Sequence, residues 1–331
     1  MFKKFKTVCL SIALASAFTI TGCSSSGEQQ YAWPLATASP EDTVTQIFAE
    51  DFAKRVYDLS DGKMKIEVYP NSTLGGDRDR LESCADGDIP FVVQNTSPQF
   101  TFMSDLAVFD LPCVFDNLTD LRNKIDDPEF SSLIQDVYLS GGYRLLGTAD
   151  QAFRVMSTNK KVSSIDDFKS QKIRTMENPY HLEFWKGLNA SPTPMSFAEV
   201  YIGLQQHTID AQENPYEVIV SNRLYEQQDY VVNTNHLPHL ITLIVNEEFF
   251  QELSPENQEI MLQAAQEATQ YAREQSDARI SDKVKTIEDS GTEIIDLDEE
   301  TRNKMRDSAS ALYEQIRNNI DSRIYDAYTS K

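Results

Sequence analysis

Apolar and polar residues follow two alternating patterns along the first half of the chain. Period-two alternation and short apolar runs predict strands at Tyr31–Leu35, Met64–Tyr69, Phe91–Val93 and Tyr143–Thr148. Helical spacing between these runs predicts helices over about 39–59, 77–87 and 117–140, and residues 106–115 form a further buried run. Strands that alternate with helices in this way are typical of a mostly parallel sheet covered on both faces.

The pattern restarts at Phe153 and predicts a second α/β unit. Strands are expected at 153–157, 172–175 and 209–212, and helices over 178–188 and 196–206. Two further apolar runs, Tyr230–Asn233 and His239–Val245, are expected to be strands that cross between the units. The rest is mainly helical, with a long helix from Ser254 to a stop at Gly291 and a last helix from 299 to about 328.

Two of the expected helix starts carry capping signals. Ser39 is followed by Pro40 and two acids, which predicts a helix that begins there with Ser39 as its cap. Ser196 and Glu199 have the spacing of a capping box, which predicts Ser196 as the cap of the later helix.

Charge and composition exclude several classes of protein. The 331 residues include 52 acidic and 30 basic ones, for a formal net charge of −22, so nucleic acid is not an expected partner. A hydrophobic content of 40% is ordinary for a globular chain that is long enough for two domains. None of the 12 glycines lies in a GxGxxG or GxxxxGK[ST] motif, which argues against a nucleotide-driven machine.

Cysteine and histidine spacing argues against a metal site. The four cysteines show no CxxC, the four histidines form no HExxH, and no GxSxG is present. Pro238 separates the one close histidine pair, His236 and His239, and disfavours a helix that would hold both on one metal. We therefore expect no metal and no cofactor. Cys84 and Cys113 could pair in an oxidising compartment or remain two buried thiols.

The first 22 residues are expected to be a signal peptide. Three lysines precede the apolar run Val8–Ile20, which is too short to span a bilayer comfortably. The run ends in Ile20-Thr21-Gly22-Cys23, which resembles a bacterial lipobox and implies cleavage before a lipidated Cys23. Residues 23–30 would then tether an exported, periplasmic or cell-surface protein to a bacterial membrane. An ordinary signal peptide with a cysteine near the cut is the alternative.

Short motifs follow one another along the rest of the chain. The first are Phe48-Ala49-Glu50, Tyr69-Pro70-Asn71 and Leu74-Gly75-Gly76-Asp77-Arg78; the later ones are Lys172-Ile173-Arg174, Pro192-Thr193-Pro194-Met195, Phe197–Tyr201, Leu204-Gln205-Gln206 and Ile209–Pro215. Their order and spacing resemble the DctP family of TRAP-transporter (tripartite ATP-independent periplasmic) solute-binding proteins over about residues 31–325. The sequence departs from that pattern at His207-Thr208 and at Ala211, where the family usually has glycine.

The resemblance implies an α/β fold of the periplasmic-binding-protein-like (type II) class. Two α/β domains would be joined by crossing strands and a long helix, and would close like a hinge on a ligand between them. Domain I is expected to comprise 31–151 plus about 240–279, and domain II 152–239 plus about 280–331. The implied function is the capture of a small organic acid and its delivery to TRAP permease subunits, without catalysis, by a chain expected to be a monomer.

Arg174 is the central candidate for the ligand site. It ends an apolar strand just before the expected helix start at Asn178-Pro179, where a guanidinium could grip a carboxylate through two charge-assisted hydrogen bonds. On the residues alone, an ion pair with one of the many acids is the favoured alternative. The resemblance, however, places Arg174 at the family's carboxylate-clamping arginine. It also makes Arg154 a second cation that supports the anion or another polar group.

Polar candidates come from both expected domains. Asn214 precedes Pro215, whose bias toward extended backbone would hold the amide toward the cleft. Gln94 and Asn95 follow a strand of the other domain and would meet the ligand from across the cleft. Asp77 and Glu177 would accept hydrogen bonds from hydroxyl groups of the ligand.

The remaining candidates have a structural alternative of nearly equal weight. Phe197 would form an apolar wall of the pocket or pack in the core at a helix start. Trp33 could stack on the carbon skeleton of the ligand or lie in the core, and the same holds for Tyr216. Glu213 and His236 are expected to lie behind the site and to orient Arg174.

Two other functions stay open at this point. An exported hydrolase or lyase could use Asp77 and Glu177 as a carboxylate pair, and a sensor could share the fold. The resemblance implies mostly carboxylate ligands, including C4-dicarboxylates, uronic and aldonic acids, 2-oxo acids, sialic acids and ectoines. The polar candidates favour a sugar acid, with a C4-dicarboxylate next.

Overall fold

A mixed sheet of nine strands organises residues 32–330, the part of the chain that the computed structural model describes. The expected signal peptide, the tether and Cys23 lie outside these residues. The strands are β1 (Ala32–Ala36), β2 (Lys65–Tyr69), β3 (Phe91–Asn95), β4 (Tyr143–Thr158), β5 (Ile173–Thr175), β6 (Thr193–Pro194), β7 (Ala211–Asn214), β8 (Tyr230–Asn246) and β9 (Glu293–Asp296).

Helices fill the connections between the strands. The α-helices are α1 (Val44–Leu59), α2 (Asp77–Ala85), α3 (Leu118–Ile125), α4 (Pro128–Ser140), α5 (Pro179–Gly187), α6 (Val200–Gln205), α7 (Tyr216–Ser221), α8 (Glu247–Glu252), α9 (Pro255–Asp289), α10 (Glu299–Ser308), α11 (Ser310–Asn319) and α12 (Ser322–Thr329). Short 3₁₀ turns are η1 (Ser97–Thr101), η2 (Ser104–Asp110), η3 (Ile165–Phe168), η4 (Phe197–Glu199) and η5 (Leu224–Gln227).

The sheet is parallel at its two sides and antiparallel in its middle. Its order is β2-β1-β3-β8-β4-β7-β5-β6, with β9 paired to β8. The β1–β2, β1–β3, β5–β6 and β5–β7 ladders are parallel, whereas β3–β8, β8–β4 and β4–β7 are antiparallel. The expectation of a mostly parallel sheet therefore holds only for the two α/β units, because the strands that join them run the opposite way.

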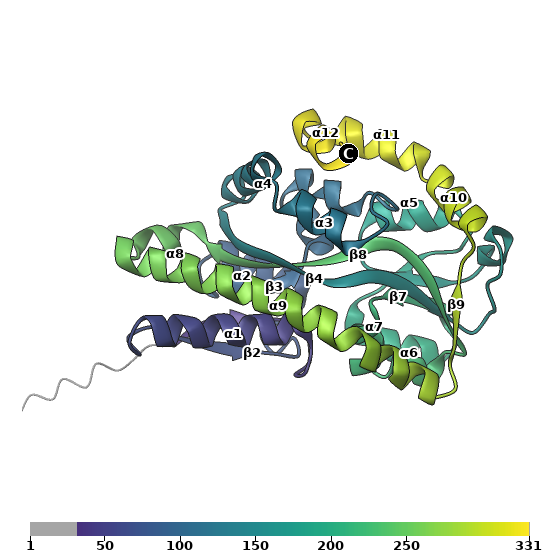
Figure 1. Ribbon diagram of the computed structural model, residues 1–331, viewed down its shortest axis with the longest axis horizontal. Helices are drawn as coiled ribbons and strands as arrows, with labels where there is room; N and C mark the ends of the chain where they lie inside the picture. Colours follow the sequence, from purple (N-terminus) through teal and green to yellow (C-terminus); the bar gives the residue numbers. More distant parts are fainter. Residues whose placement is uncertain (1–31, 331) are drawn as a thin grey trace, which may run out of the picture. The chain divides into compact units, whose positions relative to one another are not determined.

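β4 and β8 are the strands that cross between the two units, and Figure 1 shows them along the middle of the sheet. Two shorter strands were predicted in place of each, whereas β4 is one strand of 16 residues and β8 is one strand of 17 residues. The pairing of β4 with β8 shifts register between Asp150 and Phe153, where Ala152 has a positive φ of 61°. Pro238 of β8 faces Phe153 at this point, where the irregular pairing tolerates a residue without an N–H.

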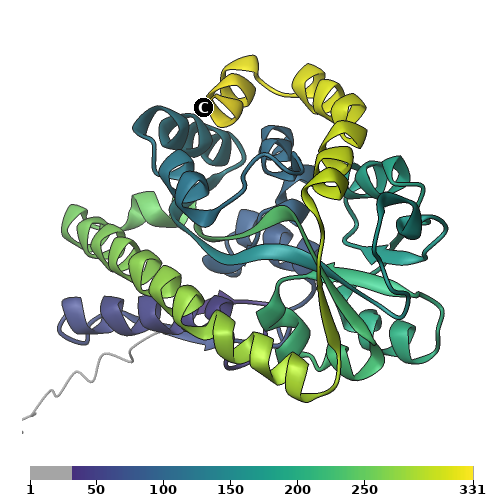
Figure 2. The ribbon, with the colours of Figure 1, turned by 45° about the vertical axis from the view of Figure 1, so that its right-hand side comes forward.

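Helix α9 joins the two units a second time. Its 35 residues bury a face of small side chains that includes Ala264, Ala265, Ala268 and Ala272. Small residues let the helix pack closely on α1 and β4 near one end and on α7 and β9 toward the other. Figures 1 and 2 show α9 crossing beside the sheet from the α1 end to the α7 end.

The hydrophobic core lies on both faces of the sheet. Within β3, Phe91 and Val93 belong to the cluster beneath α1 and α9, whereas Val92 belongs to the cluster beneath α2 to α5 and the C-terminal helices. This alternation is what a strand buried on both faces requires. The C-terminal helices contact elements of both expected domains, because α11 packs on α5 and α12 packs on α4 and η2.

The predicted cap at Ser39 is wrong, and Ser196 holds the predicted cap position without forming the predicted capping box. Asp42 adopts a positive φ of 61°, which breaks the chain direction, so α1 starts later and Thr43 caps it by accepting from the Gln46 N–H. Ser196 makes no cap hydrogen bond, and its helix begins with the 3₁₀ turn η4.

The C-terminal prediction of one helix is also wrong, because the helix is broken into three. Ile320 is extended, with φ −121° and ψ 168°, and Asp321 caps the last helix by accepting from the Arg323 N–H.

The two cysteines in the described part of the chain are free. Cys84 is buried and Cys113 is partly buried. Burial raises the pKa of each thiol to about 12, so both stay protonated and unreactive at neutral pH.

Gly147 marks the closest approach of β4 to α9 and supplies a test of this packing. A Cβ at this position would collide with the Thr269 hydroxyl of α9. We expect Gly147→Ala to lower the free energy of unfolding by about 1–3 kcal/mol, because the two elements must move apart. Urea unfolding of the pure protein measures this change. The double variant Gly147→Ala/Thr269→Ala removes the colliding atom and should recover stability, and an unchanged single variant would contradict the packing described here.

Candidate functional site

A cleft opens at the carboxyl ends of strands from both units, where α/β sheets commonly bind ligands. One wall, called the β1–β3 wall, consists of Thr37, Ala38, Ser39, Thr45, Asp77, Val93, Gln94 and Asn95. The facing wall, called the β5–β7 wall, consists of Arg174, Met176, Phe197, Asn214 and Val218, and His239 of β8 lies between the two.

Arg174 brings a buried positive charge to this cleft. It lies in β5, and only 2% of the residue is exposed. Its Nε and Nη2 both donate to the Met195 carbonyl oxygen, at 2.9 and 2.7 Å. Its guanidinium carbon lies 5.8 Å from the centre of the Phe197 ring. The carbonyl and the ring fix one edge of the guanidinium in place.

The other edge of the Arg174 guanidinium is not paired. Nη1 is buried and has no hydrogen-bond partner among residues 32–330. Burial lowers the pKa of Arg174 to about 10, with nearby Glu213 opposing the shift and Arg154 adding to it. The group remains charged at neutral pH, and a buried charge without a full set of partners costs several kcal/mol. A ligand anion would supply the missing partner.

Arg154 lies behind the cleft and does not line it. Its Nη2 donates to Glu213 Oε1 at 2.8 Å, to the Glu213 carbonyl at 2.6 Å and to Asn214 Oδ1 at 3.1 Å, and its Nε donates to Glu213 Oε2. Its Nη1 contacts His239 Nδ1 at 2.5 Å. The guanidinium is therefore engaged by protein acceptors, and Arg154 holds the side chains that face the cleft.

Glu213 and His236 form part of this layer, but Glu213 is paired with Arg154, His236 contacts Glu213, and neither is hydrogen-bonded to Arg174. His236 Nε2 lies 3.1 Å from Glu213 Oε2, and its Nδ1 lies 2.8 Å from the Thr234 hydroxyl. Despite burial, Arg154 and His236 hold the pKa of Glu213 well below its usual range. The expectation that Glu213 and His236 orient Arg174 fails because Arg154, on the adjacent strand β4, takes the carboxylate.

His239 is a cleft residue that the sequence analysis did not single out as a ligand contact. Burial lowers its pKa well below the ordinary value, and neighbouring Arg154 adds to the shift. The ring is thus neutral at neutral pH. Because Arg154 can only donate, Nδ1 of His239 must accept, which leaves the proton on Nε2. His239 therefore offers the cleft one N–H donor. No sequence motif marks it, because only the fold brings it beside Arg154.

Three predicted amide side chains line the cleft together. The Asn214 side chain is held at both ends of its amide. Its Oδ1 accepts from Arg154, and its Nδ2 donates to Gln212 Oε1 at 2.6 Å. Asn95 is tied to its own wall, since Nδ2 donates to the Leu240 carbonyl and Oδ1 accepts from the Ser97 N–H. Gln94 is buried, and its Nε2 has no partner among the described residues.

Asp77 and Phe197 line both the cleft and a second hollow at its mouth, whereas Glu177 lines only the mouth. Asp77 is at the start of α2 and accepts from Arg80 Nη2 at 2.5 Å. Glu177 is exposed. The two carboxylates therefore do not face each other in an enclosed site of the kind that acid–base catalysis requires.

The structure does not bring Trp33 to the cleft. Trp33 packs edge-on against Phe249, with ring centres 5.2 Å apart, in the core beneath α1 and α9. The cleft begins at Thr37, after the end of β1, which is about 13 Å farther along an extended chain. Tyr216 also lies elsewhere and donates to Asn233 Oδ1 at 2.5 Å.

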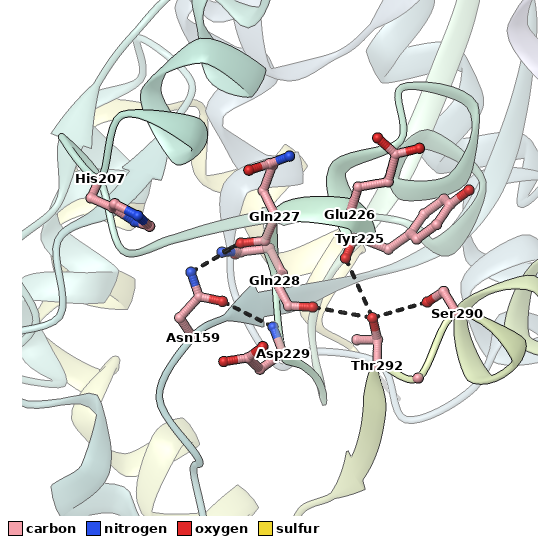
Figure 3. Close-up of a pocket in the computed structure, with 10 residues that line it drawn as sticks. Asn159, His207, Tyr225, Glu226, Gln227, Gln228, Asp229, Ser290 and Thr292 are labelled. Carbon is pink, nitrogen blue, oxygen red and sulfur yellow. Dashed lines mark hydrogen bonds between the residues drawn. The ribbon is translucent and has the colours of Figure 1, made fainter.

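Another hollow, shown in Figure 3, lies beside the start of β8 and is a weaker candidate. Its polar groups satisfy one another: Asn159 Nδ2 donates to the Gln227 carbonyl at 2.9 Å, and the Thr292 hydroxyl donates to the Gln228 carbonyl at 3.1 Å. None of its lining residues is among the side chains that carry a buried atom without a partner.

The described residues contain neither a metal-ligand cluster nor a membrane-spanning helix. Within residues 32–330, no group of three or more His, Cys, Asp or Glu side chains is arranged to hold a metal ion. In the same range, no helix combines the length and the apolar character needed to cross a membrane.

Comparison with known proteins gives one consistent result. The profile of the DctP family, described as bacterial extracellular solute-binding protein, family 7, matches residues 35–319. A solute-binding protein of Verminephrobacter eiseniae is 30% identical over 251 residues, which cover 76% of this chain and 75% of the relative.

Solved structures agree. The sugar acid binding protein DctPAm of Advenella mimigardefordensis, in complex with galactonate, has a TM-score of 0.86 at 27% identity, covering 90% of this chain and 96% of its own. A TRAP periplasmic solute binding protein of Sulfurospirillum deleyianum with bound succinate has a TM-score of 0.84 at 27% identity, covering 91% and 99%.

The neutral state of His239 predicts how stability depends on pH. The pKa of His239 in the folded protein lies well below its ordinary value of 6.5. Its contribution to the free energy of unfolding is therefore fully present above pH 6.5 and is lost as the pH falls below 6.5. His239→Gln keeps an acceptor for Arg154 and cannot be protonated. From about pH 7.5 to about pH 5.5, the wild type should lose about 1.4 kcal/mol more than this variant, measured by urea unfolding. Equal losses in the two proteins would contradict a neutral, buried His239.

Proposed function

Because the chain belongs to the DctP family of TRAP-transporter solute-binding proteins, we propose that its cleft captures a hydroxylated small organic acid and that the protein delivers it to membrane permease subunits. The family and the relatives described above are binding proteins of transporters and not enzymes. The observation that carries the proposal is the buried Nη1 of Arg174, which has no partner among the described residues.

A carboxylate is the ligand group that best completes this site. It is planar and charged, and its hydrogen bonds with a guanidinium are stronger than those between neutral groups. An uncharged ligand would leave the Arg174 charge uncompensated, at a cost of several kcal/mol. Selectivity for acids therefore follows from the penalty for leaving Arg174 unpaired.

The rest of the lining favours neutral hydroxyl groups over a second carboxylate. Hydroxyls, amides and the neutral His239 ring surround the space, notably Thr37, Ser39, Thr45, Gln94, Asn95 and Asn214. Arg174 is the only cation among the cleft-lining residues. We therefore rank a sugar acid, as in the galactonate complex of DctPAm, above a C4-dicarboxylate, as in the succinate complex.

We further propose that capture proceeds by closure of domain I on domain II, as the sequence motifs imply. Glu217 of α7 supports this proposal, because its Oε2 accepts from the Val44 N–H of α1 at 2.8 Å and from Gln151 Nε2 at 3.0 Å. Its Oε1 accepts from Arg279 Nε of α9 at 2.9 Å. The Glu217 carboxylate thus links residues of both expected domains by hydrogen bonds. It does so beside the irregular stretch around Ala152, where β4 can bend.

The position of the protein in the cell rests on the sequence. Solute-binding proteins of this family act outside the cytoplasm, which agrees with an exported, periplasmic chain. We keep lipidation of Cys23 and a monomeric state as predictions. A sensor with the same fold is a second candidate, and transport of the ligand in cells that carry or lack the permease genes would separate the two.

The test of the proposal is to identify the bound acid and then to measure how a substitution at Arg174 weakens its binding. Mass spectrometry of denatured pure protein identifies what co-purifies, and isothermal titration calorimetry measures its affinity. Arg174→Lys keeps the charge but loses the planar pair of donors, so we expect the dissociation constant to rise at least about tenfold. Arg323→Lys, an exposed substitution on α12, is the control and should change nothing. An unchanged affinity of Arg174→Lys would remove Arg174 from the site.

A further inference from the structure

A third buried arginine lies behind the β1–β3 wall, across the cleft from Arg174 and Arg154. Arg80 of α2 is fully buried. Its Nη1 donates to the Gly75 carbonyl at 2.8 Å, and its Nη2 donates to Asp77 Oδ1 at 2.5 Å and to Gln94 Oε1 at 3.3 Å. One guanidinium therefore holds the turn before α2, the first residue of α2 and the end of β3. Arg80 does not itself line the cleft.

This contact fixes which end of the Gln94 amide is free. Because the guanidinium can only donate, Gln94 must present its oxygen to Arg80. The amide nitrogen is then the remaining group of this cleft-lining residue, and it is buried without a partner in the described part of the chain. A buried donor without a partner is costly, so a ligand group that accepts a hydrogen bond here removes that cost.

The same contact also fixes the position of Asp77. Its Oδ1 is paired with Arg80, while 39% of the side chain remains exposed at the cleft and its mouth. The β1–β3 wall therefore offers one donor, from Gln94, and one acceptor, from Asp77. A hydroxyl group donates and accepts at once and matches both.

A carboxylate cannot match the pair. It has no proton to give to Asp77, and it would bring a second negative charge beside that carboxylate, with the exposed Glu177 also at the mouth. Of the nearby cations, Arg80 is engaged by Asp77 and Gln94, and Arg78 at the mouth is engaged by Glu82. An acid with carboxylates at both ends would therefore bind Arg174 at one end and be repelled at the other.

We propose that Arg80 is a positioning residue for ligand specificity. By orienting Gln94 and holding Asp77 in place, it makes the β1–β3 wall select an acid whose far end carries a hydroxyl group and reject the matching acid with a second carboxylate. This inference rests on the proposed function, because it takes for granted that one carboxylate binds Arg174.

Two pairs of acids isolate the far end of the ligand. D-Galactonate and galactarate, and D-erythronate and meso-tartrate, differ within each pair only by a terminal CH₂OH or COO⁻ group. Calorimetric titration of the intact wild-type protein should give at least about tenfold tighter binding of the hydroxyl member in a pair that binds. Equal binding of the two members, or a preference for the dicarboxylate, would overturn the inference and leave the proposed function standing. If none of the four acids binds, the proposed hydroxy-acid function itself fails, and the inference with it.

Substitutions then assign the selectivity to Arg80. Arg80→Lys keeps the charge but cannot hold three acceptors, and Gln94→Met removes the free donor at similar volume. In both variants we expect the ratio of the two dissociation constants to fall to within about threefold of one. Arg174→Lys should weaken both acids of a pair and preserve the ratio. Gln263→Met, an exposed change on α9, is the control.

A selectivity ratio is a readout that general destabilisation does not move, because both acids of a pair meet the same fold. If Arg80→Lys does not fold, as judged by circular dichroism, Gln94→Met alone decides. A folded Arg80→Lys or Gln94→Met variant that keeps the full wild-type ratio would overturn the inference.

Discussion

Arg174 holds a positive charge in a buried place where the protein completes only one edge of its guanidinium. The Met195 carbonyl accepts from Nε and Nη2, while Nη1 has no acceptor in the described structure. Because burial of an incompletely paired charge is costly, a closed and empty cleft is an unfavourable state. An anion that pairs with Nη1 would remove this penalty. Under the closure proposed above, it would shift the protein toward the closed form, so that ligand affinity and domain closure are coupled.

The other two buried arginines around the cleft have a protein carboxylate as partner. Arg154, on the adjacent part of the sheet, is equally buried, but Glu213, Asn214 and His239 engage its donors. On the other wall, Nη1 and Nη2 of Arg80 are engaged by Gly75, Asp77 and Gln94, while its Nε has no partner among the described residues. Two arginines paired with carboxylates thus orient polar side chains around Arg174, which is hydrogen-bonded to no protein carboxylate. The arrangement binds an acid without offering the enclosed carboxylate pair that a hydrolase would need.

The sequence predicted most elements and much of the site, and its failures have physical causes. Gln94 and Asn214 were predictable because they end strands, and the ends of such strands meet at one edge of a sheet. Arg174 needed the family resemblance as well, because the residues alone favoured an ion pair with a protein acid. The continuity of β4 and β8 was not, because Ala152 and Pro238 suggest breaks that the paired strand absorbs as an irregularity. The contacts that these side chains make could not be predicted from the sequence either. Glu213 pairs with Arg154, Trp33 packs against Phe249, and only the fold brings His239 to the cleft.

The most direct measurement is a crystal structure of the protein with the acid that it retains through purification. The account predicts a carboxylate oxygen of that acid about 2.7–2.9 Å from Nη1 of Arg174, with Nε and Nη2 still on the Met195 carbonyl. A structure in which Nη1 instead pairs with a protein carboxylate such as Asp77 or Glu177, while the acid lies elsewhere, would contradict it.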